Sequence, residues 1–294
     1  MDPRGRVDAR LLLPAEARAA EAAHVARAER YTLPHLERRT RGTSHPVWDF
    51  LFDYYPFRAS QLTRWHPGLG ATLIDASLSR HKDYPFYVID ADGAVRLDVD
   101  AFLAKRGRDM ERIQELLSAT ATRQAHFDCF GMHEWAMVYR TDAPRHNLPL
   151  RLGREGTDAV VDKHQLKCSH FDAYRFFTPP AVPLNLTVLE RGTQAEHDQA
   201  GCVHVSMDLY KWAAKMGPVV PGELLLDAFE LAMQARVLDM EASPYDCRSL
   251  GFGVVAVETP EGKAEYVARQ RALAAEAEPI RARLLALLEE LLAH

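Results

Sequence analysis

The segment CVHVSMDLYKWAAKMGPVVPGELLLDAFELAMQARVLDM, residues 202–240, decides the fold of this chain. It consists of two long, mainly apolar runs that are separated by Gly217 and Pro218 and followed by Ser243 and Pro244. Glycine and proline at the end of such a run are the usual stop signals of a helix. We therefore predict two long helices here, joined by a tight turn.

Other helices are predicted on both sides of this pair. Residues 14–39 are rich in Ala, Glu and Arg, which favour helix, and Pro34 predicts a break or a kink, so that we expect one long helix followed by a short one. The apolar positions of residues 100–120 have helical spacing. Residues 261–294 form a last amphipathic helix with a stripe of leucines. This stripe fits either docking onto the rest of the chain or a homodimer contact.

The β structure that we predict is small. YPFYVID and AVRLDVD flank Asp92 and Gly93, a strong two-residue hairpin turn, within residues 85–100. Short apolar runs between residues 147 and 185 (PLRLG, DAVVD, YRFF and LNLTVL) suggest irregular strands, and GVVAVET at residues 253–259 a further strand. The expected fold class is mainly α with a small β portion (α+β): a helical body with a short β-hairpin and irregular strands.

Two divisions of the chain are expected, an N-terminal helical arm at residues 1–42 and a single α+β catalytic domain at residues 43–294. The chain is 47% apolar and 26% charged, which are ordinary values for a globular protein. Its net charge of -5 gives no general attraction to a polyanion, so a nucleic acid would need a local basic patch. The four cysteines form no CxxC pair, and we expect reduced thiols, a cytoplasmic location and no membrane segment.

Histidines are concentrated in the middle of the chain. Seven of the thirteen lie between residues 126 and 204, about twice the number that even spacing would give. Histidine titrates near neutral pH, and its neutral ring is a common ligand of transition metals. We therefore expect the functional site in this region, with contributions from around residue 239.

One candidate chemistry is metal binding. His204 and Asp208 are four residues apart on a predicted helix and share a face, and His45 and Asp49 repeat that spacing. Together with the elements His170-Phe171-Asp172 or His133-Glu134, such pairs suit an iron or zinc site. The predicted metal ligands are His133, His170, His204 and Asp208. A helix-stabilising role for the pairs is the alternative.

The other candidate chemistry uses carboxylates. Glu134 lies in an apolar run, where a charged group is usually paired or functional, and the run lacks the HExxH motif of zinc proteases. If residues 169–177 form a strand, His170, Asp172 and Tyr174 share one side. Asp239 and Glu241 lie at a helix end, where they either face a cleft or cap the turn. The predicted catalytic residues are Glu134, Asp172, Asp239 and Glu241.

Several of these segments together resemble a family of bacterial proteins. They are HPVWDFLFDYY, RWHPG, GMHEWAMVYR, PLRLG, GTDAVV, HFDAYRFF, MDLYKWA and LDMEASPYD, and they extend from about residue 43 to 270. The family is named 3-methyladenine DNA glycosylase. The resemblance implies hydrolysis of the N-glycosidic bond of an alkylated purine that is flipped out of damaged DNA.

In that case aromatic residues would stack on the base, and a carboxylate would stabilise the sugar cation or activate water. The substrate-binding residues expected are Trp48, Trp65, Trp135, Tyr139, Tyr174 and Arg175. Arg58 and Arg64 beside Trp65 suit contacts with phosphates, although such a segment is as often a packed corner. The chain lacks the helix-hairpin-helix of well-understood alkyl-base glycosylases, so no catalytic residue is transferred from them.

Two functions therefore remain open at the level of sequence. The first is a DNA glycosylase acting on an alkylated purine. The second is a metal-dependent enzyme, either a non-haem iron oxygenase or a zinc hydrolase, acting on a small molecule. A binding protein without catalysis is a weaker third interpretation, since it leaves the clustered ionisable residues without a role.

Overall fold

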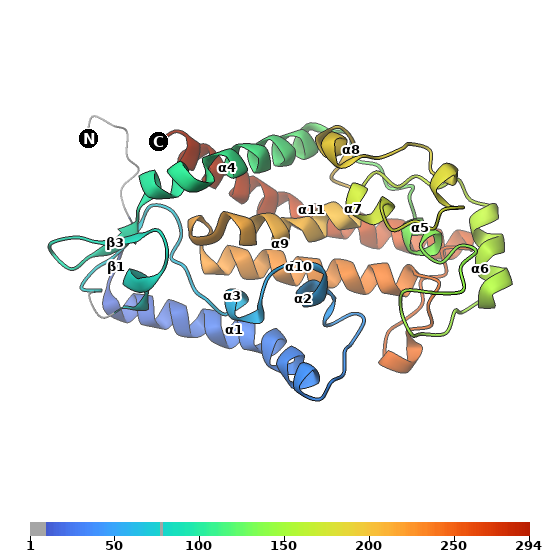
Figure 1. Cartoon of the computed structure of the whole chain (residues 1–294), viewed down its shortest axis with the longest axis horizontal. Helices are drawn as coiled ribbons and strands as arrows, with labels where there is room; N and C mark the ends of the chain where they lie inside the picture. The colour runs from blue at the N-terminus through green and yellow to red at the C-terminus, as the bar shows by residue number, and fades with distance from the viewer. Residues whose placement is uncertain (1–9, 77–78) are drawn as a thin grey trace. The chain divides into compact units, whose positions relative to one another are not determined.

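The computed structural model describes residues 10–76 and 79–294 (Figure 1). Helices hold 59% of the described residues and strands 6%, which confirms the predicted fold class, mainly α with a small β portion. The chain divides into two compact units. The first holds the residues up to Gln114, Tyr210–Phe229 and Ala282–His294, and the second holds Glu115–Leu209 and Glu230–Arg281. Neither unit has a boundary at residue 43, where we expected a division.

The first unit contains the small sheet and the N-terminal helices. Its elements are β1 (Arg10–Leu12), α1 (Pro14–Thr40), α2 (Phe50–Tyr54), α3 (Ala59–Leu62), β2 (Ala71–Leu73), the 3-10 helix η1 (Arg80–Asp83), β3 (Tyr87–Ile89) and β4 (Val95–Leu97). The strand order is β1-β2-β4-β3, with β1 parallel to β2 and the other neighbours antiparallel. The predicted hairpin is β3–β4. Strands β1 and β2 were not predicted.

The hairpin turn is held by a side chain. The carboxylate of Asp90 accepts hydrogen bonds from the backbone N–H groups of Asp92 and Ala94, at 3.1 and 2.9 Å. Gly93 takes a positive φ of 78°, which glycine adopts without strain. The predicted hairpin is therefore confirmed, but residues 90–94 lie between its strands, so the connection is longer than the predicted two-residue turn.

Helix α1 continues through Pro34 to Thr40, so the separate short helix that we expected does not form. Contacts after the proline keep the last turns helical. Asp49 is buried and accepts hydrogen bonds from Arg38 Nε at 2.8 Å and from His35 Nδ1 at 2.9 Å. Burial raises the pKa of Asp49, but these donors outweigh it and hold that pKa below its usual value. Tertiary ion pairing thus compensates for the hydrogen bond that Pro34 cannot make.

The second unit is almost wholly helical. Its short helices are α5 (Met132–Ala136), α6 (Gly153–Asp162), α7 (Phe171–Tyr174) and α8 (Gln194–His197). Four long helices have residues in both units: α4 (Val99–Thr122), α9 (Val203–Met216), α10 (Gly222–Ala242) and α11 (Pro260–Leu292). These four were predicted. Short 3-10 helices form at η2 (Val182–Leu184), η3 (Arg191–Thr193), η4 (Gly217–Val219) and η5 (Arg248–Leu250).

Most strands predicted for the second unit are wrong. DAVVD belongs to α6, and the segment before YRFF forms α7, so the side-by-side strand arrangement of His170, Asp172 and Tyr174 does not occur. Residues 253–259 form no strand, because Gly253 and Val255 donate their backbone hydrogen bonds to Glu241 at the end of α10. Of the region 147–185, only isolated bridges at Leu150 and Leu166 are β-like among the described residues.

Burial distinguishes the long helices. In α11, Leu284, Leu288 and Leu291 are fully buried within the chain, so docking accounts for this part of its leucine stripe.

None of the helices that the structure describes combines the length and the apolar character needed to cross a membrane. The C-terminal half of α10 is buried on almost every side, yet it carries the charged residues Arg236 and Asp239. This exception leads to the candidate site.

We predict opposite effects of alanine at two helical glycines. A Cβ at Gly262, in the first turn of α11, would overlap the carbonyl group of Ala256. Gly262→Ala should therefore lower the free energy of unfolding by about 1–3 kcal/mol. Gly107→Ala in α4 is the matched control, since its Cβ would meet only Leu103 at 4.0 Å. That variant should be more stable by about 0.5–1 kcal/mol in urea unfolding. Equal effects of the two changes would contradict this prediction.

Candidate functional site

A buried ion network in the second unit is the frame of the site. Arg236 and Asp239 on α10 are 1% and 0% exposed, and Glu134 on α5 is 5% exposed. Arg236 Nη1 donates to Glu134 Oε1 at 2.9 Å and to Asp239 Oδ2 at 2.7 Å. Buried charges cost several kcal/mol each unless they are paired. The guanidinium therefore fixes both carboxylates.

His133 adds a second partner to Asp239. Its Nε2 donates to Asp239 Oδ1 at 2.6 Å. Burial alone would raise the pKa of Asp239, but His133, His204 and Arg236 outweigh it and hold that pKa well below its usual range. Glu134 behaves differently, since burial and the nearby charge of Asp239 raise its pKa despite Arg236. The two carboxyl groups on one arginine thus have different proton affinities.

His204 on α9 lies directly against His133. The ring centroids are 4.4 Å apart at an angle of 78°. His204 is 7% exposed, and burial, followed by the charge of His133, lowers its pKa well below the usual value. It is therefore neutral at pH 7. Among the described residues, neither of its ring nitrogens has a hydrogen-bond partner, and neither is one of their fully buried, unpaired polar atoms.

His170 extends the cluster at the start of α7. Its Nδ1 donates to Asp198 Oδ1 at 2.9 Å, and Gln194 Nε2 donates to the other oxygen of Asp198 at 2.8 Å. The His170 ring stacks on His204 with centroids 5.4 Å apart, and its Nε2 is 3.7 Å from Asp208 Oδ2. His204 and Asp208 therefore share one side of α9, as their spacing predicts.

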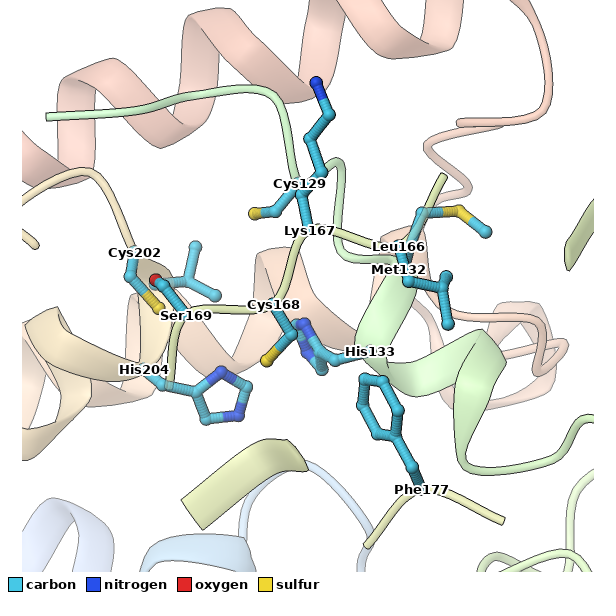
Figure 2. Close-up of a pocket in the computed structure, with 11 residues that line it drawn as sticks. Cys129, Met132, His133, Leu166, Lys167, Cys168, Ser169, Phe177, Cys202 and His204 are labelled. Carbon is cyan, nitrogen blue, oxygen red and sulfur yellow. The ribbon is translucent and has the colours of Figure 1, made fainter. Parts of the chain in front are cut away.

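A small cavity adjoins this cluster. Figure 2 shows the side chains of His133 and His204 at its wall together with three cysteines. Its volume is about 10 Å³. The lining residues are Cys129, Met132, His133, Leu166, Lys167, Cys168, Ser169, Phe177, Cys202, Val203 and His204. All four cysteines of the chain are free thiols, and burial raises the pKa of Cys168 to about 12. The cavity is thus lined by neutral thiols and a neutral imidazole.

Two groups of side chains have the donors and spacing of a metal site. One ligand atom from each of His133, His204 and Asp239 lies within 4.8 Å of the others, and all three residues are buried. The second group consists of His170, Asp172 and Asp208 at the same spacing. Asp172 in this group also pairs with Arg175 Nε at 3.2 Å. Asp239 in the first group likewise pairs with an arginine, Arg236, at 2.7 Å, and the two groups differ in that Asp172 is only partly buried.

The second unit brings together most of the polar residues that the sequence singled out. They are His133, Glu134, His170, Asp172, His204, Asp208 and Asp239. Glu241 lies apart from them and pairs with Arg269 Nη2 at 2.6 Å. In the first unit Asp49 pairs with Arg38 and His35, so the spacing of His45 and Asp49 reflects a structural contact there.

The aromatic residues predicted to bind a base are dispersed. Trp135 is fully buried, and its Nε1 donates to the carbonyl of Ala242 at 2.9 Å. Tyr139 donates its hydroxyl to Asp162 at 2.6 Å. Tyr174 is buried, while Arg175 covers the ring of Phe176 at 4.3 Å.

The two other predicted tryptophans, Trp48 and Trp65, belong to the first unit. Trp48 is 38% exposed, and Trp65 packs in a core cluster with Leu73 and Val95.

Sequence reasoning missed three members of the network: Arg236, Asp198 and His146. Arg236 Nη2 donates to His146 Nε2 at 3.1 Å, and since arginine cannot accept, His146 is the acceptor. Burial, followed by the charges of Arg236 and Arg145, lowers the pKa of His146 to about 4. One signal was present, namely an arginine three residues before Asp239 within an apolar helix.

Comparisons of this chain with known proteins add no further information. No family model, no curated protein and no solved structure matches it. We therefore infer the function from the geometry of the site.

Removing Arg236 should destabilise the protein strongly. Arg236→Met leaves Glu134 and Asp239 buried together without their shared cation, which should cost about 3–5 kcal/mol in urea unfolding. The double variant Arg236→Met, Glu134→Gln removes one of the two charges and should recover part of this loss. A double variant no more stable than Arg236→Met would show that the charge of Glu134 is not what Arg236 compensates.

The neutral state of His146 predicts a dependence of stability on pH. The pKa of His146 is about 4 in the folded protein, against an ordinary value of 6.5. At a pH between these two values, His146 is protonated in the unfolded chain but not in the folded protein. The contribution to stability is complete above pH 6.5 and decreases as the pH falls toward 4. In His146→Gln, the free energy of unfolding should therefore fall less between pH 7 and 5. An unchanged fall in urea unfolding would contradict the prediction.

Proposed function

We propose that this chain is a metal-dependent enzyme that holds one transition-metal ion with His133, His204 and Asp239. The observation that carries the proposal is His204. Its ring is buried and neutral and touches His133, and among the described residues its nitrogens have no hydrogen-bond partner. A neutral imidazole with an available nitrogen is the form that binds a metal.

The donor set suggests which ion. Two imidazoles and one carboxylate suit iron or zinc, whereas magnesium and calcium prefer oxygen ligands alone. Such a three-residue set leaves further positions on the ion open for water or substrate. A bound ion of this kind acts as a Lewis acid or lowers the pKa of water. A small-molecule oxygenase or hydrolase reaction is the class that we infer.

The surrounding residues would orient the ligands. Arg236 holds Asp239 by a 2.7 Å hydrogen bond, which leaves its other oxygen toward His133. His170, held by Asp198, stacks on His204 and limits rotation of that ring. Partners of this kind, one shell outside the ligands, usually matter for metal affinity.

The metal site predicts a measurable difference between two histidine variants. His204→Gln should reduce the affinity for Zn²⁺ or Fe²⁺ on the order of 100-fold or more, because it removes a direct ligand. His126→Gln is the matched control, since His126 is exposed. Metal content by elemental analysis and affinity by competition with a chelator give the readout. Circular dichroism checks that both variants are folded.

Two results would refute the metal proposal. One is a protein that holds no transition metal as purified and takes up none when reconstituted with Zn²⁺ or, without oxygen, Fe²⁺. The other is a His204→Gln variant with the affinity of His126→Gln. In either case the buried histidines would have a purely structural role.

A second candidate is removal of an alkylated purine from DNA, as the family resemblance implies. The observation that favours it is Glu134, a buried carboxyl group whose pKa is raised by burial and by Asp239. Such a group suits general acid or base chemistry. Incubation with methylated duplex DNA and detection of released base tests this candidate. No release above that of the Glu134→Gln variant would remove it.

A further inference from the structure

The first unit contains a second, larger cavity that the proposed metal site does not involve. Its volume is about 170 Å³. Its lining includes Phe57, Gln61, Arg64, His66, Phe86, Tyr210 and Ala214. All of them belong to the first unit. The cavity is therefore a property of that unit alone.

The size of the cavity limits its occupant. An apolar cavity of roughly 150 Å³ accommodates benzene. A cavity of about 170 Å³ therefore has room for one aromatic ring with a small substituent.

Aromatic side chains form much of the wall. Phe57 and Tyr210 meet edge to face, with ring centroids 5.7 Å apart at 75°. Phe86 packs in the same manner against Phe102, at 5.1 Å and 79°. Pairing of this kind holds rings in fixed orientations. A flat ring between them gains both apolar burial and further edge-to-face contacts.

Phe86 also carries backbone strain. Its φ is +68°, a conformation that costs a bulky residue roughly 1–3 kcal/mol. Strained residues of this kind tend to cluster at ligand sites, where the surrounding structure maintains them. The strained residue thus lies in the wall of the cavity.

The charge of the lining is positive. Arg64 lies over the ring of Tyr84, with its guanidinium carbon 4.7 Å from the ring centroid. His66 Nδ1 is hydrogen-bonded to Tyr87 Oη at 3.0 Å, and burial, with smaller effects of His81 and Arg64, lowers the pKa of His66 to about 3. His66 is thus neutral at pH 7. Among the described lining residues none is acidic, so Arg64 is their one full charge.

We propose that this cavity binds a small aromatic carboxylate, with its ring between the aromatic walls and its carboxylate paired with Arg64. The planar guanidinium matches a carboxylate through two parallel hydrogen bonds. His66 and Gln61 supply additional polar contacts at the same wall. The site lies in a different unit from the metal ligands, and the proposal does not depend on them.

Three probes of equal shape and different charge test the proposal: benzoate, benzamide and benzamidinium. Binding to the full chain is measured by calorimetry and by saturation-transfer NMR. Benzoate should bind at least about tenfold more tightly than benzamide, and benzamidinium most weakly, because Arg64 attracts an anion and repels a cation. Equal affinity for the three probes, or no binding of benzoate at millimolar concentration, would overturn the proposal.

Variants locate the bound probe. Arg64→Met keeps the side-chain stem and should lower benzoate affinity about tenfold without changing that of benzamide. Arg96→Met, on the exposed side of β4, is the matched control and should change neither. Ala214→Leu should fill the cavity and abolish binding of both probes. Benzoate affinity that is unaffected by Arg64→Met or Ala214→Leu would place the binding elsewhere and refute the site.

Discussion

The buried guanidinium of Arg236 is the constraint on which the second unit depends. It lies on a helix that is otherwise apolar, and it bonds to Glu134 and Asp239 at 2.9 and 2.7 Å. A cation in such surroundings is tolerated only with its anions in place. Because α5 must supply Glu134, this pairing fixes α5 against α10 and carries His133 to the carboxylate of Asp239. The position of His133 therefore follows from the ion pair next to it.

Burial beside Arg236 also explains why His146 and His204 are neutral. Each sits where burial opposes a positive charge, and Arg236 nearby increases that opposition for His146 and His204. Asp239 remains an anion in the same surroundings, since its hydrogen bonds outweigh burial. A neutral nitrogen donor beside a fixed anion is what a divalent transition metal requires of its ligands. Burial thus leaves His204 neutral, whereas His133, His204 and Arg236 keep Asp239 an anion.

The sequence predicted the helices and part of the site, for reasons that are local. Apolar runs with Gly217 or Pro244 after them locate α9 and α10, and histidine enrichment pointed to the segment that supplies His133, His170 and His204. The strand predicted at residues 253–259 does not form, because the backbone N–H groups of Gly253 and Val255 donate to Glu241 at the end of α10. Arg236 was missed because its partner Glu134 is 102 residues away, a pairing that only the folded chain defines.

The small cavity beside His133 and His204 has a kinetic consequence. With a volume of about 10 Å³, it holds about one water molecule, so no organic compound fits in the closed structure. If the proposed reaction takes place beside these rings, its substrate requires a transient opening of their surroundings. Such motions take microseconds to milliseconds and commonly set the turnover of enzymes with enclosed sites. Solvent viscosity and temperature affect such opening motions. They would then influence the turnover rate as much as the chemical step does.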